Sequence, residues 1–254
     1  MIHEMDLNRA FKYASKFIFD SEIGDMHDYE TYLKEAVVGK FVESIFSGDR
    51  LFVTSDQYSS TCKFFNYEKE NEKANQLLSR PISINEIKDM DSLLNAVSEK
   101  FLYSGAKVLG NSLNVTNSDN IMNCSCVENS SMLVNCRYIA YSYASRNSEY
   151  VFGATSSGDS SWTIRCFYNN RLQRCFECCA SVSVQDCYFC YNIRNCHDCL
   201  FTFNTSSKNY SIANISLEKN RYFDLKKKLM QEMLVLLERD KKLNFSVLNL
   251  EGIV

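Results

Sequence analysis

Pairs of cysteines recur in the C-terminal half of the chain at a spacing that could hold a metal ion. Three C-x-x-C pairs follow one another, and two thiolates separated by two residues can reach the same tetrahedral zinc ion. The six candidate ligands are Cys175, Cys178, Cys187, Cys190, Cys196 and Cys199. Zinc-binding pairs are usually followed by a turn-forming residue, whereas Cys, Tyr and Leu follow these three. A zinc site is therefore one of two interpretations of these cysteines.

The second interpretation comes from a short repeat. Residues 115–150 divide into six consecutive hexads, and all six carry Ser or Cys at the fourth place. Five of them begin with Val, Ile or Leu, and such a fixed short period is typical of a β-solenoid. A metal ligand cannot be exchanged for serine from unit to unit, but a small side chain stacked inside a narrow solenoid can. We therefore predict a core ladder made of Ser118, Cys124, Ser130, Cys136, Ser142, Ser148, Cys175, Cys187 and Cys196.

Asparagine fills the third place of five hexads. Asn tolerates left-handed backbone and bonds to neighbouring main chain, so stacked copies should form a hydrogen-bonded ladder along a corner of the solenoid. The asparagines concerned are Asn117, Asn123, Asn129, Asn135, Asn147 and Asn195. This pattern predicts a structural role for them and not a binding site.

Residues that could catalyse a reaction are sparse. Solenoid enzymes that act on sugars need converging carboxylates or a histidine on one lateral face, and the candidates are Glu177, Asp186 and Asp198. His197 could act as a further zinc ligand or as a general base, although a solvent-facing turn position is the simpler interpretation. The sequence contains no G-x-S-x-G, no phosphate-binding glycine-rich loop and no dinucleotide fingerprint. We assign no catalytic residue.

Composition and charge argue against several classes of protein. The chain has 254 residues, a formal net charge of −3 and a pI near 5.7, so it has no global positive field to collect nucleic acid or an acidic membrane. Its first residues mix acidic with apolar side chains, and we expect neither a signal peptide nor a membrane span there. A cytoplasmic protein is expected, in which most of the 12 cysteines stay reduced.

Three regions with different periodicities must position these residues. Residues 1–106 are expected to form a mostly helical N-terminal domain. Residues 107–215 are expected to form a parallel β-solenoid of hexad-like units. Residues 216–254 should supply a C-terminal capping helix and a strand-like tail that close the open end. The predicted fold class is α+β, a parallel β-solenoid (β-helix) with a helical N-terminal domain and a C-terminal capping helix.

Local patterns refine this division. Apolar residues at helical spacing predict helices over about 5–18 and 28–46, and a third that is capped by Asp91 and ends at Gly105. Glycine and serine between residues 151 and 162 predict a protruding loop or widened corner that interrupts the repeat. The last helix is predicted over roughly residues 217–239. Its solvent face is expected to carry Lys226, Lys227 and Lys228.

Part of the chain resembles a group of cysteine-rich parallel β-helix proteins of unknown function from uncultivated bacteria and some phages. The resembling segments are NSEYVFG from Asn147, the C-x-x-C units, IRNCHDCLFTFN, and ISLEKNRYFDLKKKL from Ile215. In that group a segment like R-N-K-x-Y-C-I precedes a capping helix that begins near K-E-x-Y, and SKNYSI and EKNRY occupy those places here. This chain departs from the group in its helical N-terminal region, which replaces zinc-ribbon-like segments, and in Ser211, which replaces a cysteine. The resemblance implies a fold and no activity.

These patterns favour a non-enzymatic structural or protein-interaction protein. Its solenoid would be a rigid scaffold or docking face in a larger assembly, such as a phage particle. The expected partners are other protein chains in a homo- or hetero-oligomer, with no membrane, no nucleic acid and no cofactor. Its expected location is the cytoplasm, or the virion if it is phage-encoded. The alternatives are a zinc-stabilised binding module that uses the C-x-x-C cluster and a carbohydrate-active β-helix enzyme.

Overall fold

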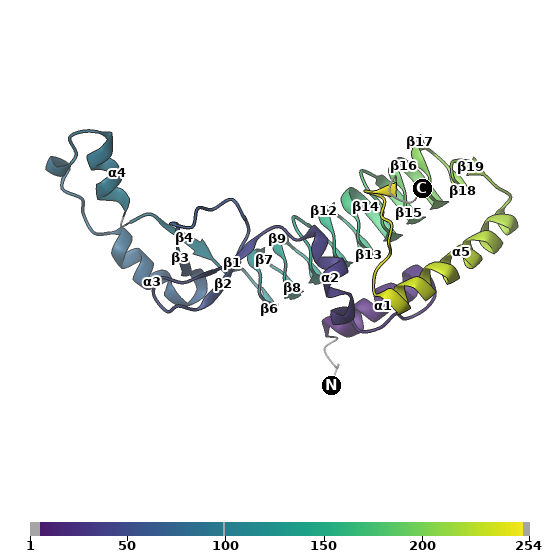
Figure 1. Cartoon of the computed structure of the whole chain (residues 1–254), viewed down its shortest axis with the longest axis horizontal. Coiled ribbons are helices and arrows are strands. Elements are labelled where there is room, and N and C mark those ends of the chain that lie inside the picture. Colours follow the sequence, from purple (N-terminus) through teal and green to yellow (C-terminus); the bar gives the residue numbers. More distant parts are fainter. Residues whose placement is uncertain (1–5, 99, 251–254) are drawn as a thin grey trace.

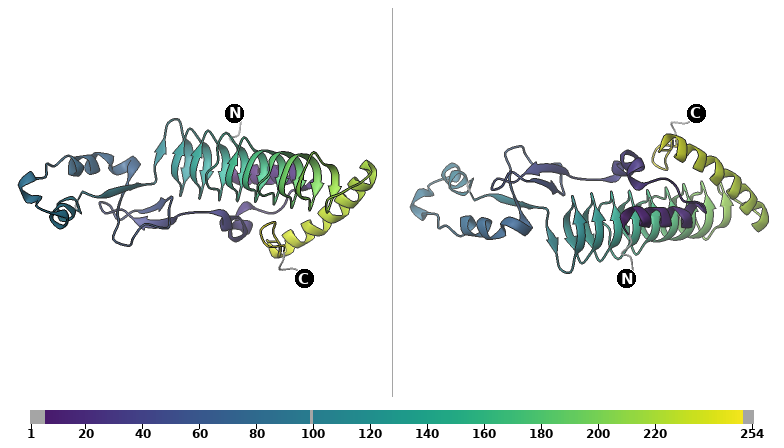
Figure 2. Two further views of the ribbon diagram at one scale, coloured as in Figure 1. Left: turned by 90° about the horizontal axis from the view of Figure 1, so that it is seen from above. Right: turned by 90° about the horizontal axis from the view of Figure 1, so that it is seen from below.

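The computed structural model describes residues 6–98 and 100–250 and contains a parallel β-solenoid of about nine turns (Figure 1). Helices lie in the N-terminal region, and one long helix follows the solenoid, so the predicted fold class is confirmed. The two further views show an elongated molecule in which α3 and α4 project beyond the N-terminal end of the solenoid (Figure 2). Among the helices of these residues, none combines the length and hydropathy that crossing a membrane requires.

Two hexads make one coil of the solenoid. Paired residues of neighbouring strands are twelve apart in sequence, as in the parallel pairs Arg137 with Glu149 and Ile139 with Val151. Successive hexads therefore lie on opposite faces of a flattened coil. The strands are β5 (Val108–Leu109), β6 (Leu113–Thr116), β7 (Asp119–Met122), β8 (Ser125–Glu128), β9 (Ser131–Val134), β10 (Arg137–Ala140), β11 (Glu149–Phe152), β12 (Thr155–Gly158), β13 (Ser161–Ile164), β14 (Phe167–Phe176), β15 (Val182–Tyr188), β16 (Tyr191–Leu200), β17 (Phe203–Ser206) and β18 (Asn209–Ile212).

The backbone of the solenoid repeats every three residues. Every third residue from Asn114 to Ala213 has a positive φ angle, between 45° and 66°. None of these positions holds Val, Ile or Thr, which β-branching makes costly in left-handed backbone. The residue that follows each of them points inward, and Val127, Leu133 and Ile139 are fully buried at such places. Each hexad is thus two such triplets, so its first and fourth places both point into the coil.

The predicted interruption at residues 151–162 is wrong. Val151 pairs with Thr163, and isolated bridges join Tyr143 to Thr155, so the register of the coils continues through this segment. Gly153 has φ 66° and takes an ordinary left-handed place of the three-residue period. The turn-forming residues that suggested a loop are in fact what the regular coil needs.

The N-terminal region is less helical than predicted. The first predicted helix is confirmed as α1 (Leu7–Phe19), whose first turn is capped by the Asp6 side chain. The predicted helix over 28–46 is wrong, because short helical turns there give way to a β-hairpin that begins just after Gly39, whose φ is 134°. The turns and strands are η1 (Met26–Tyr29), α2 (Glu30–Leu33), η2 (Lys34–Ala36), β1 (Lys40–Glu43) and β2 (Arg50–Val53). Val37, Val38 and Gly39 favour extended backbone and end the helical turns.

A small lobe connects this hairpin to the solenoid. Its elements are β3 (Lys63–Asn66), α3 (Tyr67–Leu78), η3 (Ile84–Glu86), α4 (Met90–Ser98) and β4 (Leu102–Gly105). Strands β3 and β4 pair in parallel. The predicted helix from Asp91 to Gly105 therefore ends early, at Ser98, and its last residues form β4. The domain boundaries at residues 106 and 215 stay a prediction.

Helices from both ends of the chain cover one lateral face of the solenoid. Helix α1 packs on it through aromatic contacts, with Phe11 5.2 Å from Phe152 and Phe19 5.0 Å from Phe176 between ring centroids. The predicted capping helix is α5 (Lys219–Asp240), which lies at the C-terminal end (Figure 1). Before it, β19 (Ile215–Ser216) pairs antiparallel with β18 and closes that edge of the sheet. Residues 241–250 contain no strand, so the strand-like tail is not found within them.

Candidate functional site

The nine residues predicted as a core ladder all lie buried in the solenoid. Residues twelve apart stack into interior columns. One column contains Ser118, Ser130 and Ser142, and a second contains Cys124, Cys136, Ser148 and Cys196. Cys175 and Cys187 belong to a third column, since Cys175 pairs with Thr163 and Cys187 pairs with Cys199. Both therefore occupy the first, aliphatic place of the hexad, as Ile139 does, and their predicted alignment with the fourth place is wrong.

Where the fourth place holds Ser or Cys, the side chain can both donate and accept a hydrogen bond. The Ser130 hydroxyl donates to the carbonyl oxygen of Glu128 at 2.7 Å and accepts from the backbone N–H of Ser142 at 3.1 Å. The Cys124 thiol does the same, accepting from the N–H of Cys136 at 3.3 Å. At this corner the backbone N–H turns inward, away from the strand ladder, and would otherwise be buried without a partner. The ladder therefore supplies hydrogen-bond acceptors to backbone N–H groups that are buried inside the solenoid.

The asparagines form part of a second ladder on the outside. All six predicted ladder asparagines have positive φ angles. Side-chain amides of one column are hydrogen-bonded in sequence, from Asn135 to Asn147 at 3.1 Å and from Asn147 to Asp159 at 3.2 Å. Asn117 and Asn129 belong to a different column, and Asn195 shares the column of this run but is separated from it by Arg171 and Ser183.

The six C-x-x-C cysteines line the interior and do not converge on one point. Their thiols are oriented toward backbone carbonyl oxygens, for example Cys178 toward Cys187 at 3.2 Å and Cys187 toward Gln185 at 3.2 Å. Burial raises the pKa of the Cys178 and Cys187 thiols. Burial also opposes ionisation of Cys190, but hydrogen bonds from those two thiols and from backbone groups lower its pKa. Within the described part of the chain, no group of three or more His, Cys, Asp or Glu residues is arranged to hold a metal ion. That these cysteines are core residues and not zinc ligands stays a prediction.

Elemental analysis tests the prediction that these cysteines bind no zinc. Protein purified without a chelator should carry well below one zinc ion per chain, and EDTA should leave its thermal unfolding midpoint unchanged. A structural zinc ion typically contributes about 10 kcal/mol or more to folding, so its removal would unfold the protein. One zinc ion per chain that is lost together with the fold on chelation would contradict the core interpretation of the cysteines.

The structure brings two of the three candidate carboxylates into one lateral column, and each already has a cationic partner. Asp186 accepts two hydrogen bonds from Arg174, at 2.7 and 2.6 Å. Burial opposes ionisation of Asp186, but the hydrogen bonds from Arg174 and Gln185 and the charges of Arg174 and Lys226 together lower its pKa. Asp198 lies 3.2 Å from His197 and 3.9 Å from the Lys226 amine. A glycosidase pair instead needs one carboxyl group whose pKa is raised so that it can act as an acid.

Lys226 is not on the solvent face of the last helix, in contrast to the prediction. Its amine lies 4.6 Å from the centre of the Tyr188 ring, and burial lowers its pKa despite the nearby carboxylates of Asp186 and Asp198. Helix α5 crosses the solenoid at this level, so the three consecutive lysines cannot all face water. Lys227 and Lys228 are exposed, as predicted.

No family model matches this chain, and no curated protein does. The resemblance to cysteine-rich β-helix proteins therefore stays a prediction as regards family and origin. The solenoid and its many buried cysteines are what the structure supports.

The third carboxylate, Glu177, belongs to a buried network that sequence reasoning missed. Its side chain is fully buried and forms an ion pair with Arg165, whose guanidinium also donates to the carbonyl oxygen of Tyr32. The Tyr32 hydroxyl donates to Glu177 at 3.0 Å, and the Ser246 hydroxyl donates to it at 2.5 Å. The network joins α2, two coils and the C-terminal tail. The available signal was a pair of opposite charges twelve residues apart, as in Arg174 and Asp186.

Helix α4, which projects beyond the solenoid, carries exposed apolar side chains (Figure 1). No side chain of α4 is buried, and Met90 and Leu94 are 66% and 55% exposed. Ile84 and Phe101, just before and after the helix, are also exposed. We call these four residues the distal apolar patch. The helical spacing of apolar residues was visible in the sequence, but their exposure was not.

Proposed function

We propose that this protein is a non-enzymatic interaction protein in which the solenoid is a rigid spacer and the distal apolar patch docks another protein chain. The observation that carries the proposal is the complete lack of buried side chains on α4. The proposal assigns no catalytic residue and no cofactor.

An isolated helix of this size is marginal in water. Helix α4 has nine residues, fewer than the dozen or so that even good helix formers need to be stable alone. Burying a Met or Leu side chain contributes about 1.5–3 kcal/mol relative to leaving it exposed. A partner that covered Met90 and Leu94 would supply the burial that this chain does not, which is how exposed apolar patches at protein interaction sites behave.

The solenoid suits the role of a spacer because its coils are joined by backbone hydrogen bonds and interior columns over its whole length. Each coil adds about 4.8 Å, the distance between neighbouring strands. The lobe that carries α4 is therefore held well away from α5, at the other end of the molecule (Figure 2).

Sedimentation velocity over a range of concentrations, together with affinity capture from the native host, tests the proposal. Association of the wild type, with itself or with a captured protein, should weaken roughly 30-fold or more in the Leu94→Asp variant, as for a residue at the centre of an interface. The matched control is Val235→Asp, because Val235 is a helix residue that is 61% exposed on α5. A wild type that neither self-associates nor captures a protein in a Leu94-dependent way would contradict the proposal.

A further inference from the structure

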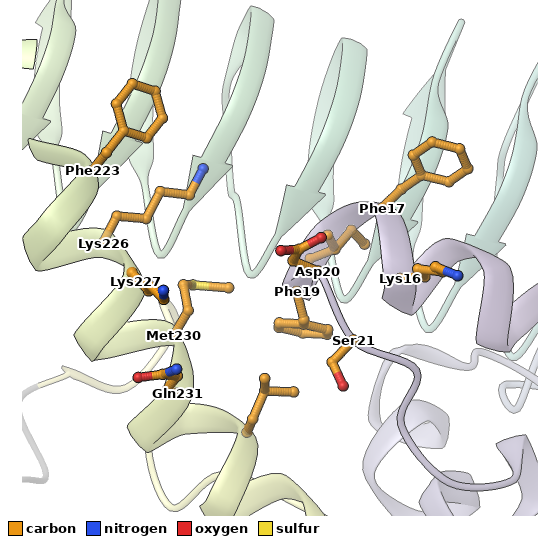
Figure 3. A pocket seen from close by; sticks show the side chains of 12 residues that line it. Lys16, Phe17, Phe19, Asp20, Ser21, Phe223, Lys226, Lys227, Met230 and Gln231 are labelled. Carbon is orange, nitrogen blue, oxygen red and sulfur yellow. The ribbon is translucent and has the colours of Figure 1, made fainter. Parts of the chain in front are cut away.

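A cleft of about 680 Å³ opens between the C-terminal end of α1 and the middle of α5 (Figure 3). One wall comes from residues 16–21 and the other from residues 223–234. The volume lies within the range of sites that hold small molecules. The cleft is far from the distal apolar patch, at the other end of the elongated molecule (Figure 1).

The walls of the cleft carry apolar side chains that are partly exposed to solvent. Phe17 on α1 and Phe223 on α5 are 44% and 40% exposed, although both are large aromatic side chains. Phe19 and Met230 lie between them and are buried (Figure 3). The two half-exposed rings lie on facing helices, with apolar side chains between them. An apolar part of a ligand would bury both rings, so this arrangement favours such a ligand.

The charges of the lining favour an anion. Three lysines line the cleft, Lys16, Lys226 and Lys227, against a single carboxylate, Asp20. Lys226 is already beside Asp198, at 3.9 Å. Lys16 and Lys227 are exposed, and neither lies within 4 Å of a carboxylate oxygen of any described residue. Two cations, one on each wall of the cleft, thus have no carboxylate partner among the described residues.

We propose that this cleft binds a single-chain anionic amphiphile, with its alkyl chain between Phe17 and Phe223 and its headgroup beside Lys16 and Lys227. A small polar anion would leave the two aromatic rings exposed to solvent. A cationic amphiphile would be repelled by the three lysines.

The single tryptophan of the chain provides the readout. Trp162 lies 4.9 Å from Phe17 between ring centroids, so a ligand that covers Phe17 should change its fluorescence. The probes are decanoate, dodecanoate and tetradecanoate, each titrated below its micelle concentration. We expect saturable binding to one site, with Kd falling by up to about fourfold for each added methylene group.

Charge variants identify the headgroup site. The double variant Lys16→Glu, Lys227→Glu should weaken dodecanoate binding more than tenfold and leave dodecan-1-ol binding within about twofold. Lys228→Glu is the matched control, because Lys228 is an exposed neighbour on the same helix that does not line the cleft. Leu94→Asp should bind dodecanoate like the wild type, which keeps this inference separate from the docking proposal.

Three outcomes would overturn the inference. The first is no saturable change with any of the three carboxylates. The second is binding of dodecyltrimethylammonium as tight as that of dodecanoate. The third is an equal loss of dodecanoate binding in Lys228→Glu and in the double variant, which would indicate a general charge effect and not a site.

Discussion

The Arg165→Met variant should be less stable than the wild type by about 3–5 kcal/mol, because it leaves a buried carboxylate without its cation. Glu177 is fully buried, and its remaining partners, the hydroxyl groups of Tyr32 and Ser246 and a backbone N–H, are neutral. Urea unfolding at neutral pH, followed by circular dichroism, measures the loss. It is the largest single-residue effect that we expect in this chain.

The double variant Arg165→Met, Glu177→Met separates the lost ion pair from lost packing. Replacing a buried ion pair by apolar residues of similar volume is often neutral or stabilising, so the double variant should recover most of the stability that Arg165→Met loses. If the single variant cost less than about 1 kcal/mol, water would have to reach Glu177, and the network would not be buried as described above.

The Gly153→Ala variant should be destabilised by about 2–3 kcal/mol, because left-handed backbone disfavours alanine and the added methyl group has no room. Gly153 has φ 66°, and a Cβ atom there would lie 3.0 Å from Leu33 Cδ2 and 3.1 Å from the Leu33 carbonyl oxygen. Leu33 belongs to α2, so the short helix would have to move. Thermal and urea unfolding measure this cost.

Gly158→Ala is the matched control for this substitution. Gly158 lies on the next hexad, outside the left-handed positions, and the nearest atom to its Cβ would be 4.0 Å away. We expect its stability to stay within about 0.5 kcal/mol of the wild type. Equal stability of the two variants would show that α2 does not press on the solenoid at Gly153.

The repeat could be predicted from sequence because each place of the hexad has its own physical requirement. In the hexads of residues 115–150, aliphatic residues fill most first places and Ser or Cys fills the fourth, where the side chain accepts from a backbone N–H. The three-residue period was harder to see, because left-handed positions accept Asn, Tyr, Arg and Gly alike. Gly153 and Asp159 were therefore interpreted as loop residues, although both take regular left-handed places.

The contacts between distant segments could not be predicted in the same way. The pair Arg165 and Glu177 follows from the twelve-residue coil once its length is known. The roles of Tyr32 and Ser246 depend on where α2 and the tail lie on the solenoid, and no periodicity encodes that placement. The second predicted helix failed for a local reason, since Tyr32, Val37 and Phe41 have helical spacing but Gly39 supports a hairpin.

The hydrogen bond from Ser246 to Glu177 also determines how the molecule would respond to mechanical force. The chain leaves the last coil at β19, runs through α5 and returns to a coil about three turns earlier, where the tail is fastened. Tension applied at the C-terminal end is therefore delivered to this interior coil first. The terminal coils lie inside the closed loop and bear no load until the fastening breaks, so they cannot be peeled off one at a time. Under pulling, the tail should release in one step before any coil unwinds.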